Sequence, residues 1–142
     1  MIDRYIFHLS LPVDDLVAAE QFYVRVLGAT IGRRDPEWVD ALLWGHQITL
    51  QLQPEQVLTA QSQGKRHFGV ILPWPQWQQL AQRLAHESVE FLSPPQVHHP
   101  GTPQEQAKLY LRDPAHNVIE IKAYRDSRST VGCGDSNYGY PD

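Results

Sequence analysis

Residues 67–88, HFGVILPWPQWQQLAQRLAHES, begin as a strand and continue as a helix, and this order decides the fold. The first six residues form a short apolar run, as a buried strand does. Pro75 then stands where the first turn of a helix accepts proline. Apolar side chains recur on one helical face at Trp77, Leu80 and Leu84. This half of the chain therefore opens with a strand and an amphipathic helix.

The same opening occurs earlier, in residues 6–28, IFHLSLPVDDLVAAEQFYVRVLG. An alternating strand is followed by a helix that starts at Asp14 or Asp15 and stops at Gly28. Three strand-like segments follow each helix, at 29–33, 38–44 and 47–53 in the first half and at 89–95, 108–113 and 117–124 in the second. The chain is thus an internal repeat of one βαβββ unit.

This repeat predicts an α+β fold of two tandem βαβββ modules. We expect a single domain over residues 1–125, with module one at about 5–53 and module two at about 67–125. The polar residues 54–66 form the predicted linker. Residues 126–142 are rich in Gly, Ser and Asp, and we expect a flexible tail there.

Composition excludes several classes of protein. The 142 residues are 42% hydrophobic and 20% charged, which suits one globular domain, and no window approaches a membrane span. The N-terminus lacks the pattern of a secretory signal, so we expect a cytoplasmic location. A net charge of −4 with 12 Lys and Arg argues against nucleic-acid binding. One cysteine, Cys133, excludes an internal disulfide and a thiolate zinc site. We expect a small-molecule substrate, no membrane partner and a homodimer.

Strand alternation brings polar side chains onto the face opposite the apolar one. If the helices cover the apolar face, the other face carries His8, Gln51, His67 and Glu120. Two imidazoles and one carboxylate suit a divalent first-row metal and leave coordination positions open. Alternatively, both histidines are ordinary strand residues and Glu120 faces solvent. Their matching positions in an internal repeat favour a metal site.

These modules and strand positions resemble the vicinal oxygen chelate superfamily, which includes glyoxalase I, extradiol dioxygenases, fosfomycin-resistance transferases and bleomycin-binding proteins. The resemblance covers residues 5 to about 125. It implies a metal held in the cleft between curved sheets by ligands from the first and last strands of the modules. Carried over by position, these ligands are His8, His67 and Glu120.

Within the superfamily, Leu109-Tyr110, Asp113-Pro114 and Glu120 are similar to the signature of extradiol dioxygenases. There are two departures. His116 stands where the signature has Gly or Pro, and the nearest upstream histidine, His99, is slightly too far away. The chain looks most like the short, single-domain, extradiol-type members. The resemblance therefore implies a dioxygenase with Fe(II) as the first expectation and Mn, Ni or Zn as alternatives.

Gln51 is interpreted as the residue of module one that matches Glu120. Glyoxalase I typically has a carboxylate or a further ligand at that place, and a neutral amide is no general base at pH 7. We expect Gln51 to contact substrate, although a fourth-ligand role stays open. Tyr110 is a candidate for substrate binding and, with His99, for proton transfer; the alternative is that the Tyr110 ring only packs. A glyoxalase-like lyase or isomerase and a non-catalytic drug-binding protein are the other hypotheses.

Overall fold

The computed structural model describes residues 3–87 and 89–130 of the 142-residue chain. Cys133 and most of the predicted flexible tail, residues 126–142, lie outside the described residues. The chain divides into two compact units: unit 1 comprises Met1–Phe68 and Arg112–Ile119, and unit 2 comprises Gly69–Leu111 and Glu120–Asp142. Unit 1 therefore includes a short segment from the second half of the sequence.

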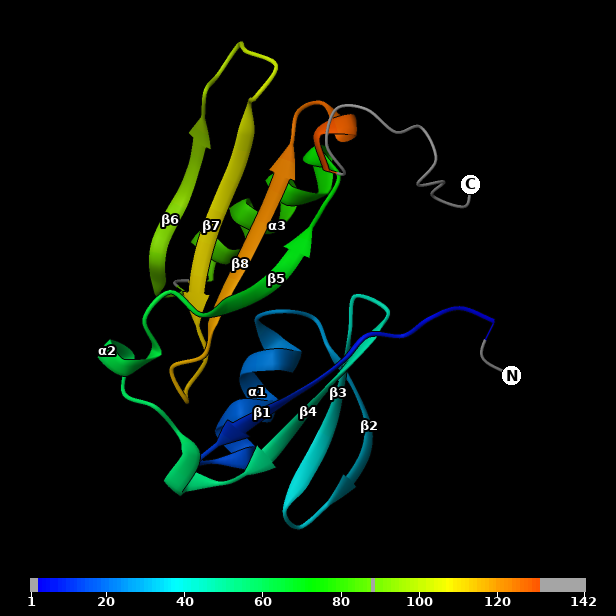
Figure 1. Ribbon diagram of the computed structural model, residues 1–142, viewed down its shortest axis with the longest axis vertical. Coiled ribbons are helices and arrows are strands. Elements are labelled where there is room, and N and C mark those ends of the chain that lie inside the picture. The colour runs from blue at the N-terminus through cyan, green and yellow to red at the C-terminus, as the bar shows by residue number, and fades with distance from the viewer. Residues whose placement is uncertain (1–2, 88, 131–142) are drawn as a thin grey trace. The chain divides into compact units, whose positions relative to one another are not determined.

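The first module is a strand, a helix and three further strands, as the sequence predicts. These are β1 (His8–Val13), α1 (Leu16–Arg25), β2 (Thr30–Asp35), β3 (Trp38–Leu43) and β4 (His46–Leu52). The strands form one sheet in the order β1-β4-β3-β2, with β1 parallel to β4 and the other pairs antiparallel. α1 lies against one face of this sheet (Figure 1). The opposite face is left for polar side chains.

Local residues explain where these elements begin and end. The Asp15 side chain accepts the backbone N–H of Ala18 at 3.0 Å and caps the start of α1. Gly28, with φ of 79°, lets the chain leave the helix through the left-handed region. Trp44 and Gly45 have φ values of 52° and 78°. These two left-handed residues make a tight turn whose twist matches the β3–β4 hairpin.

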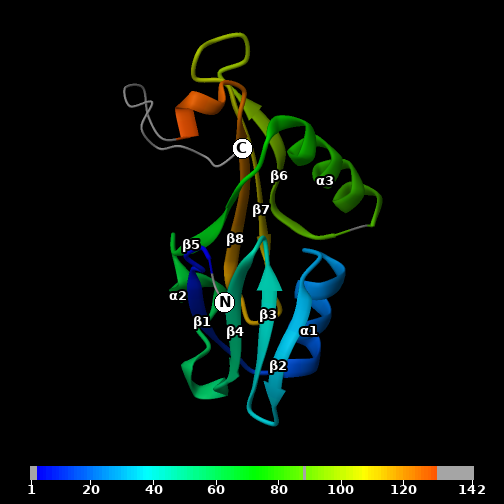
Figure 2. The same ribbon diagram turned by 90° about the vertical axis from the view of Figure 1, so that its right-hand side faces the viewer.

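The second module repeats this order after a connection that is more structured than predicted. Residues 54–66 contain η1 (Pro54–Gln56) and α2 (Ala60–Gln63). The module itself consists of β5 (His67–Ile71), α3 (Trp74–His86), β6 (Phe91–His98), β7 (Gln106–Arg112) and β8 (Val118–Tyr124), and a 3-10 helix, η2 (Ser127–Thr130), follows. The strand order is β5-β8-β7-β6. Figure 2 shows α3 beside this sheet. The α+β class and the two βαβββ modules with curved sheets are confirmed.

β6 continues three residues beyond the predicted segment 89–95, although it contains Pro94 and Pro95. It is the edge strand of its sheet, where a missing backbone N–H breaks few ladder bonds. The register with β7 shifts between Ser93 and Gln96. The irregular strand thus accommodates both prolines.

Buried apolar side chains hold each helix against its sheet. In unit 1, Tyr23 of α1 is fully buried together with Leu50 of β4. In unit 2, the Trp77 indole of α3 donates its N–H to the backbone oxygen of Ile121 on β8 at 2.9 Å.

Among the residues described, no helix is long and apolar enough to cross a membrane.

Candidate active site

The polar face of the first sheet follows from its register. His8 of β1 pairs with Gln47 of β4, and Asp40 of β3 pairs with Thr49 of β4. Paired residues point to the same face, and alternate residues of a strand share it. His8, Gln47, Thr49 and Gln51 therefore stand on one face with Asp40. The sequence prediction that His8 and Gln51 share a polar face is in agreement with this register.

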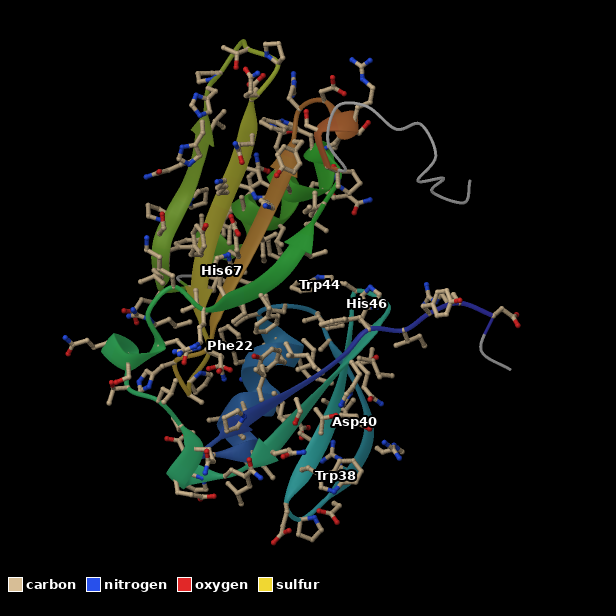
Figure 3. All side chains as sticks on the ribbon, in the orientation of Figure 1. Phe22, Trp38, Asp40, Trp44, His46 and His67 are labelled. Carbon is tan, nitrogen blue, oxygen red and sulfur yellow. The ribbon has the colours of Figure 1, made fainter. Side chains whose placement is uncertain are left out.

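Asp40 is a buried carboxylate on that face, and sequence reasoning missed it. Only 1% of the residue is exposed. It accepts hydrogen bonds from Thr49 Oγ1 at 2.7 Å, Arg33 Nε at 3.0 Å and Gln47 Nε2 at 3.3 Å. These three donors offset the cost of burying a charge. Figure 3 shows Asp40 on β3 near Trp38, whose ring lies 5.3 Å from the Arg33 guanidinium.

The two first-strand histidines are held in the same way by their Nδ1 atoms. His8 Nδ1 lies 2.8 Å from Gln47 Oε1, and His67 Nδ1 lies 2.7 Å from the backbone oxygen of Lys65. A carbonyl oxygen only accepts, so each Nδ1 carries the hydrogen. In the neutral ring the lone pair is then on Nε2. Metal-binding histidines usually have this arrangement, with the second nitrogen donating to a carbonyl or carboxylate.

Glu120 of β8 is buried, with 7% of the residue exposed, and it contacts Tyr110 of the neighbouring strand β7. The Tyr110 hydroxyl donates a hydrogen bond to the carboxylate. Partial burial, this hydrogen bond and the charge of Glu120 together raise the pKa of Tyr110 to about 12. Tyr110 therefore stays protonated at neutral pH. It orients the carboxylate and is no base there.

The backbone of Glu120 passes unusually close to Gly69 of β5. A Cβ atom on Gly69 would overlap the carbonyl oxygen of Glu120 and stand 2.7 Å from its carbonyl carbon. Only glycine permits this approach without a shift of one strand. Gly69 thus sets the position of the chain that carries Glu120.

The residue of module one that matches Glu120 is Thr49, and the predicted match with Gln51 is wrong by two positions. Each last hairpin turn ends in a left-handed residue, Gly45 with φ of 78° and His116 with φ of 67°. The fourth residue after that turn residue is Thr49 in β4 and Glu120 in β8. The Thr49 hydroxyl is neutral, so module one has no carboxylate at this place. Substrate contact by Gln51, which pairs with Trp38, stays a prediction.

Asp113, the acidic residue of the extradiol-like motif, has a structural role. It is 3% exposed, and its Oδ1 accepts the backbone N–H groups of Ala115 and Asn117 at 2.9 and 2.8 Å. Its Oδ2 accepts the Tyr23 hydroxyl and Asn117 Nδ2, both at 2.8 Å. The pKa of Asp113 is raised by burial, which outweighs these hydrogen bonds. The motif therefore builds the β7–β8 turn and attaches it to α1.

His99 lies in the exposed turn between β6 and β7. Its φ is 51°, and its carbonyl oxygen accepts the Thr102 hydroxyl at 2.7 Å and the Thr102 N–H at 3.2 Å. The main chain of His99 thus shapes the turn. A part in proton transfer by its imidazole stays a prediction.

Within residues 3–87 and 89–130, no three His, Cys, Asp or Glu side chains are grouped so that they could hold a metal ion. His8 and His67 belong to unit 1 and Glu120 to unit 2. The predicted three-ligand set therefore stays a prediction. The donor chemistry of each residue nevertheless suits a divalent metal: two rings with the hydrogen on Nδ1, and a buried carboxylate.

Comparison with known proteins gives one family and several related structures. A family model described as the Glyoxalase/Bleomycin resistance protein/Dioxygenase superfamily matches residues 5–121. The crystal structure of a glyoxalase/bleomycin resistance protein/dioxygenase from Alicyclobacillus acidocaldarius is 29% identical, with a TM-score of 0.78 over 87% of this chain and 94% of that one.

Two further solved structures share the fold at lower identity. The fosfomycin resistance protein FosX from Listeria monocytogenes is 18% identical, with a TM-score of 0.67 over 87% of this chain and 94% of that one. Lactoylglutathione lyase from Agrobacterium tumefaciens is 20% identical, with a TM-score of 0.60 over 87% and 95%. No curated protein matches the chain. At these identities the two structures support the fold alone.

Proposed function

Because the chain belongs to the Glyoxalase/Bleomycin resistance protein/Dioxygenase superfamily, we propose that it is a metal-dependent enzyme of the extradiol dioxygenase type. Its substrate would be a small molecule with two vicinal oxygens. The ligands would be His8, His67 and Glu120, and Fe(II) is the metal expected first, with Mn, Ni or Zn as alternatives. We propose a homodimer as the functional state, which sedimentation analysis tests.

The state of the two histidines is the observation that carries this proposal. His8 and His67 both place an oxygen acceptor against Nδ1, one from Gln47 and one from the main chain at Lys65. An ordinary surface histidine needs neither acceptor. Two such rings at matching first-strand positions of a repeat fit a metal site, because metal-binding histidines usually donate their second ring N–H to such an acceptor. The buried carboxylate of Glu120 adds the anionic donor.

A bound divalent metal lowers the pKa of a substrate hydroxyl and brings two reactants together. The residues of the chain supply orientation around it. Tyr110 holds the Glu120 carboxylate by donating its hydroxyl hydrogen, and the raised pKa keeps that hydrogen in place at neutral pH. Tyr110 is thus a hydrogen-bond donor to a proposed ligand, and of the two residues considered for proton transfer, His99 is the one proposed to accept a proton.

A glyoxalase-type lyase or isomerase is the second hypothesis, and Asp40 is the observation that favours it. This buried carboxylate shares the polar face of its sheet with His8, so module one has an acidic group after all. Three donors already occupy it, however, which makes it a poor general base. We therefore rank this hypothesis below the dioxygenase.

Metal analysis and two activity assays test the proposal. Protein purified without oxygen should contain, or take up, one divalent metal per chain, and Glu120→Gln should lose most of it. Iron-loaded protein should then consume O2 with at least one compound of a catechol panel. Turnover of methylglyoxal with glutathione, without O2 uptake, would support the lyase instead. A wild-type protein that binds no Fe(II), Mn, Ni or Zn would exclude both enzymes and favour a drug-binding protein.

A further inference from the structure

We propose that Asp40 and Gln47 are positioning residues that fix the tautomer of His8. They would hold the hydrogen on Nδ1, so that Nε2 presents its lone pair. This inference rests on the proposed function, in which His8 binds the metal. It assigns a task to the buried carboxylate, which has no other part in the proposed chemistry.

Asp40 faces Arg33 and Gln47 as a hydrogen-bond acceptor. Arg33 Nε donates to Asp40 Oδ2 at 3.0 Å, and a guanidinium never accepts. Oδ2 is therefore a hydrogen-free acceptor. Gln47 Nε2 lies 3.3 Å from the same oxygen. The side of the Gln47 amide that faces Asp40 must consequently be its NH2 group.

The orientation of the Gln47 amide determines which atom faces His8. An amide has one donor end and one acceptor end, so a Gln47 side chain with its NH2 toward Asp40 turns Oε1 the other way. That oxygen lies 2.8 Å from His8 Nδ1. Because Oε1 only accepts, His8 Nδ1 must donate. The contact is possible because the two residues are direct partners in the β1–β4 register and share one face.

The two proposed histidine ligands differ in how this state is enforced. The acceptor of His67 is the backbone oxygen of Lys65, and a main-chain carbonyl cannot exchange its donor and acceptor ends. The acceptor of His8 is a side-chain amide that can turn over. Without Asp40, Gln47 could present either end to His8. The tautomer of His8 thus depends on two other side chains, Gln47 and Asp40, whereas that of His67 depends on the main chain.

Three variants separate orientation from general stability. Gln47→Met removes both ends of the amide while keeping a side chain of similar length. Asp40→Asn is the conservative rescue variant, because Arg33 can only donate and so keeps the Asn carbonyl oxygen facing Arg33 and Gln47. Gln96→Met is the matched control, since it makes the same substitution at an exposed position of a strand in the other sheet, β6.

Long-range proton–nitrogen NMR correlation of the metal-free protein reads the tautomer directly. Wild type, Asp40→Asn and Gln96→Met should show His8 with its hydrogen on Nδ1, whereas Gln47→Met should lose this preference. Titration with Zn²⁺ alone should then show a loss of about 10- to 100-fold in affinity for Gln47→Met, the usual size for removing a partner of a ligand. Circular dichroism confirms that each variant is folded.

Two results would overturn the inference. One is an NMR correlation that places the hydrogen of His8 on Nε2 in the wild-type protein, a result that requires no variant. The other is a folded Gln47→Met protein whose His8 pattern and Zn²⁺ affinity equal those of wild type. A wild-type protein that binds no metal would instead refute the proposed function, while the tautomer measurement would still decide the role of Asp40 and Gln47.

Discussion

Substitution of Gly69 by alanine should lower the stability of the fold and weaken the proposed metal site, because the added Cβ would overlap the backbone of Glu120. The new Cβ would stand 2.7 Å from the Glu120 carbonyl carbon, whereas ordinary contacts begin at 3.4 Å. That carbon must therefore retreat by about 0.7 Å, and the overlapped oxygen by more. Backbone atoms in a strand ladder cannot rotate away as a side-chain end can. We expect a loss of about 1–3 kcal/mol in the free energy of unfolding, as for overpacked interiors.

The same shift should disturb the proposed metal site, since it moves Glu120, the proposed anionic ligand. We expect Gly69→Ala to lower metal affinity by about 10- to 100-fold, in the range found when the support of a ligand is disturbed. Urea unfolding measures the first effect and calorimetric titration with Zn²⁺ the second. The titrations are run without urea and below the midpoint temperature of unfolding of each variant, so that only folded protein is compared.

Gly32→Ala is the matched control, because Gly32 also lies in a strand. Its added Cβ would be 3.5 Å from the Asp40 Cβ and 3.5 Å from Leu42 Cγ, which is ordinary contact. This variant should be as stable as wild type, or more stable by about 0.4–1 kcal/mol through the reduced entropy of the unfolded chain. If Gly69→Ala matched the control in both stability and affinity, the close approach of β5 to Glu120 would not exist in solution.

Three further predictions concern hydrogen-bonded side chains. Tyr110→Phe should weaken metal binding and lower the stability at neutral pH, because the hydroxyl's contribution to stability is present below its unfolded pKa of 10 and is lost as the pH rises through about 12. Urea unfolding of both proteins should therefore show a difference at neutral pH that shrinks across this range. Tyr23→Phe should cost about 1–2 kcal/mol at neutral pH and less in acid, because its hydroxyl stabilises the ionised Asp113 whose pKa burial has raised; equal losses at both pH values would contradict this. Glu120→Ala should lose most bound metal in elemental analysis, whereas Gln51→Ala should keep it; equal loss would indicate four ligands.

The repeated module was predictable because it depends on local patterns. Alternation along β1 and the helical period of α3 require no knowledge of distant residues. Alternation predicts which face of the sheet a side chain lies on. It does not distinguish two positions that are two residues apart, because both lie on the same face. Thr49 and Gln51 share a face, so the sequence could not choose between them as the match of Glu120. The left-handed turn residue decides it in the structure.

Asp40 was missed for a different reason. It stands inside WVDALLW, residues 38–44, where its neighbours suggest an apolar strand and a tolerated surface charge. Its three donors come from β2 and β4, so they become visible only when the register of three strands is known. A side chain whose role depends on hydrogen bonds to neighbouring strands cannot be recognised from residue spacing in a single sequence.

The hydrogen bond from Tyr23 to Asp113 joins residues 90 positions apart within one compact unit. During synthesis, the phenol of α1 emerges from the ribosome long before the turn that accepts it. The first half of the chain would thus fold with its largest fully buried side chain lacking a polar partner, until the strands of the second half are complete. The first half of the chain, made alone, would therefore leave the Tyr23 hydroxyl without the acceptor that it has in this structure.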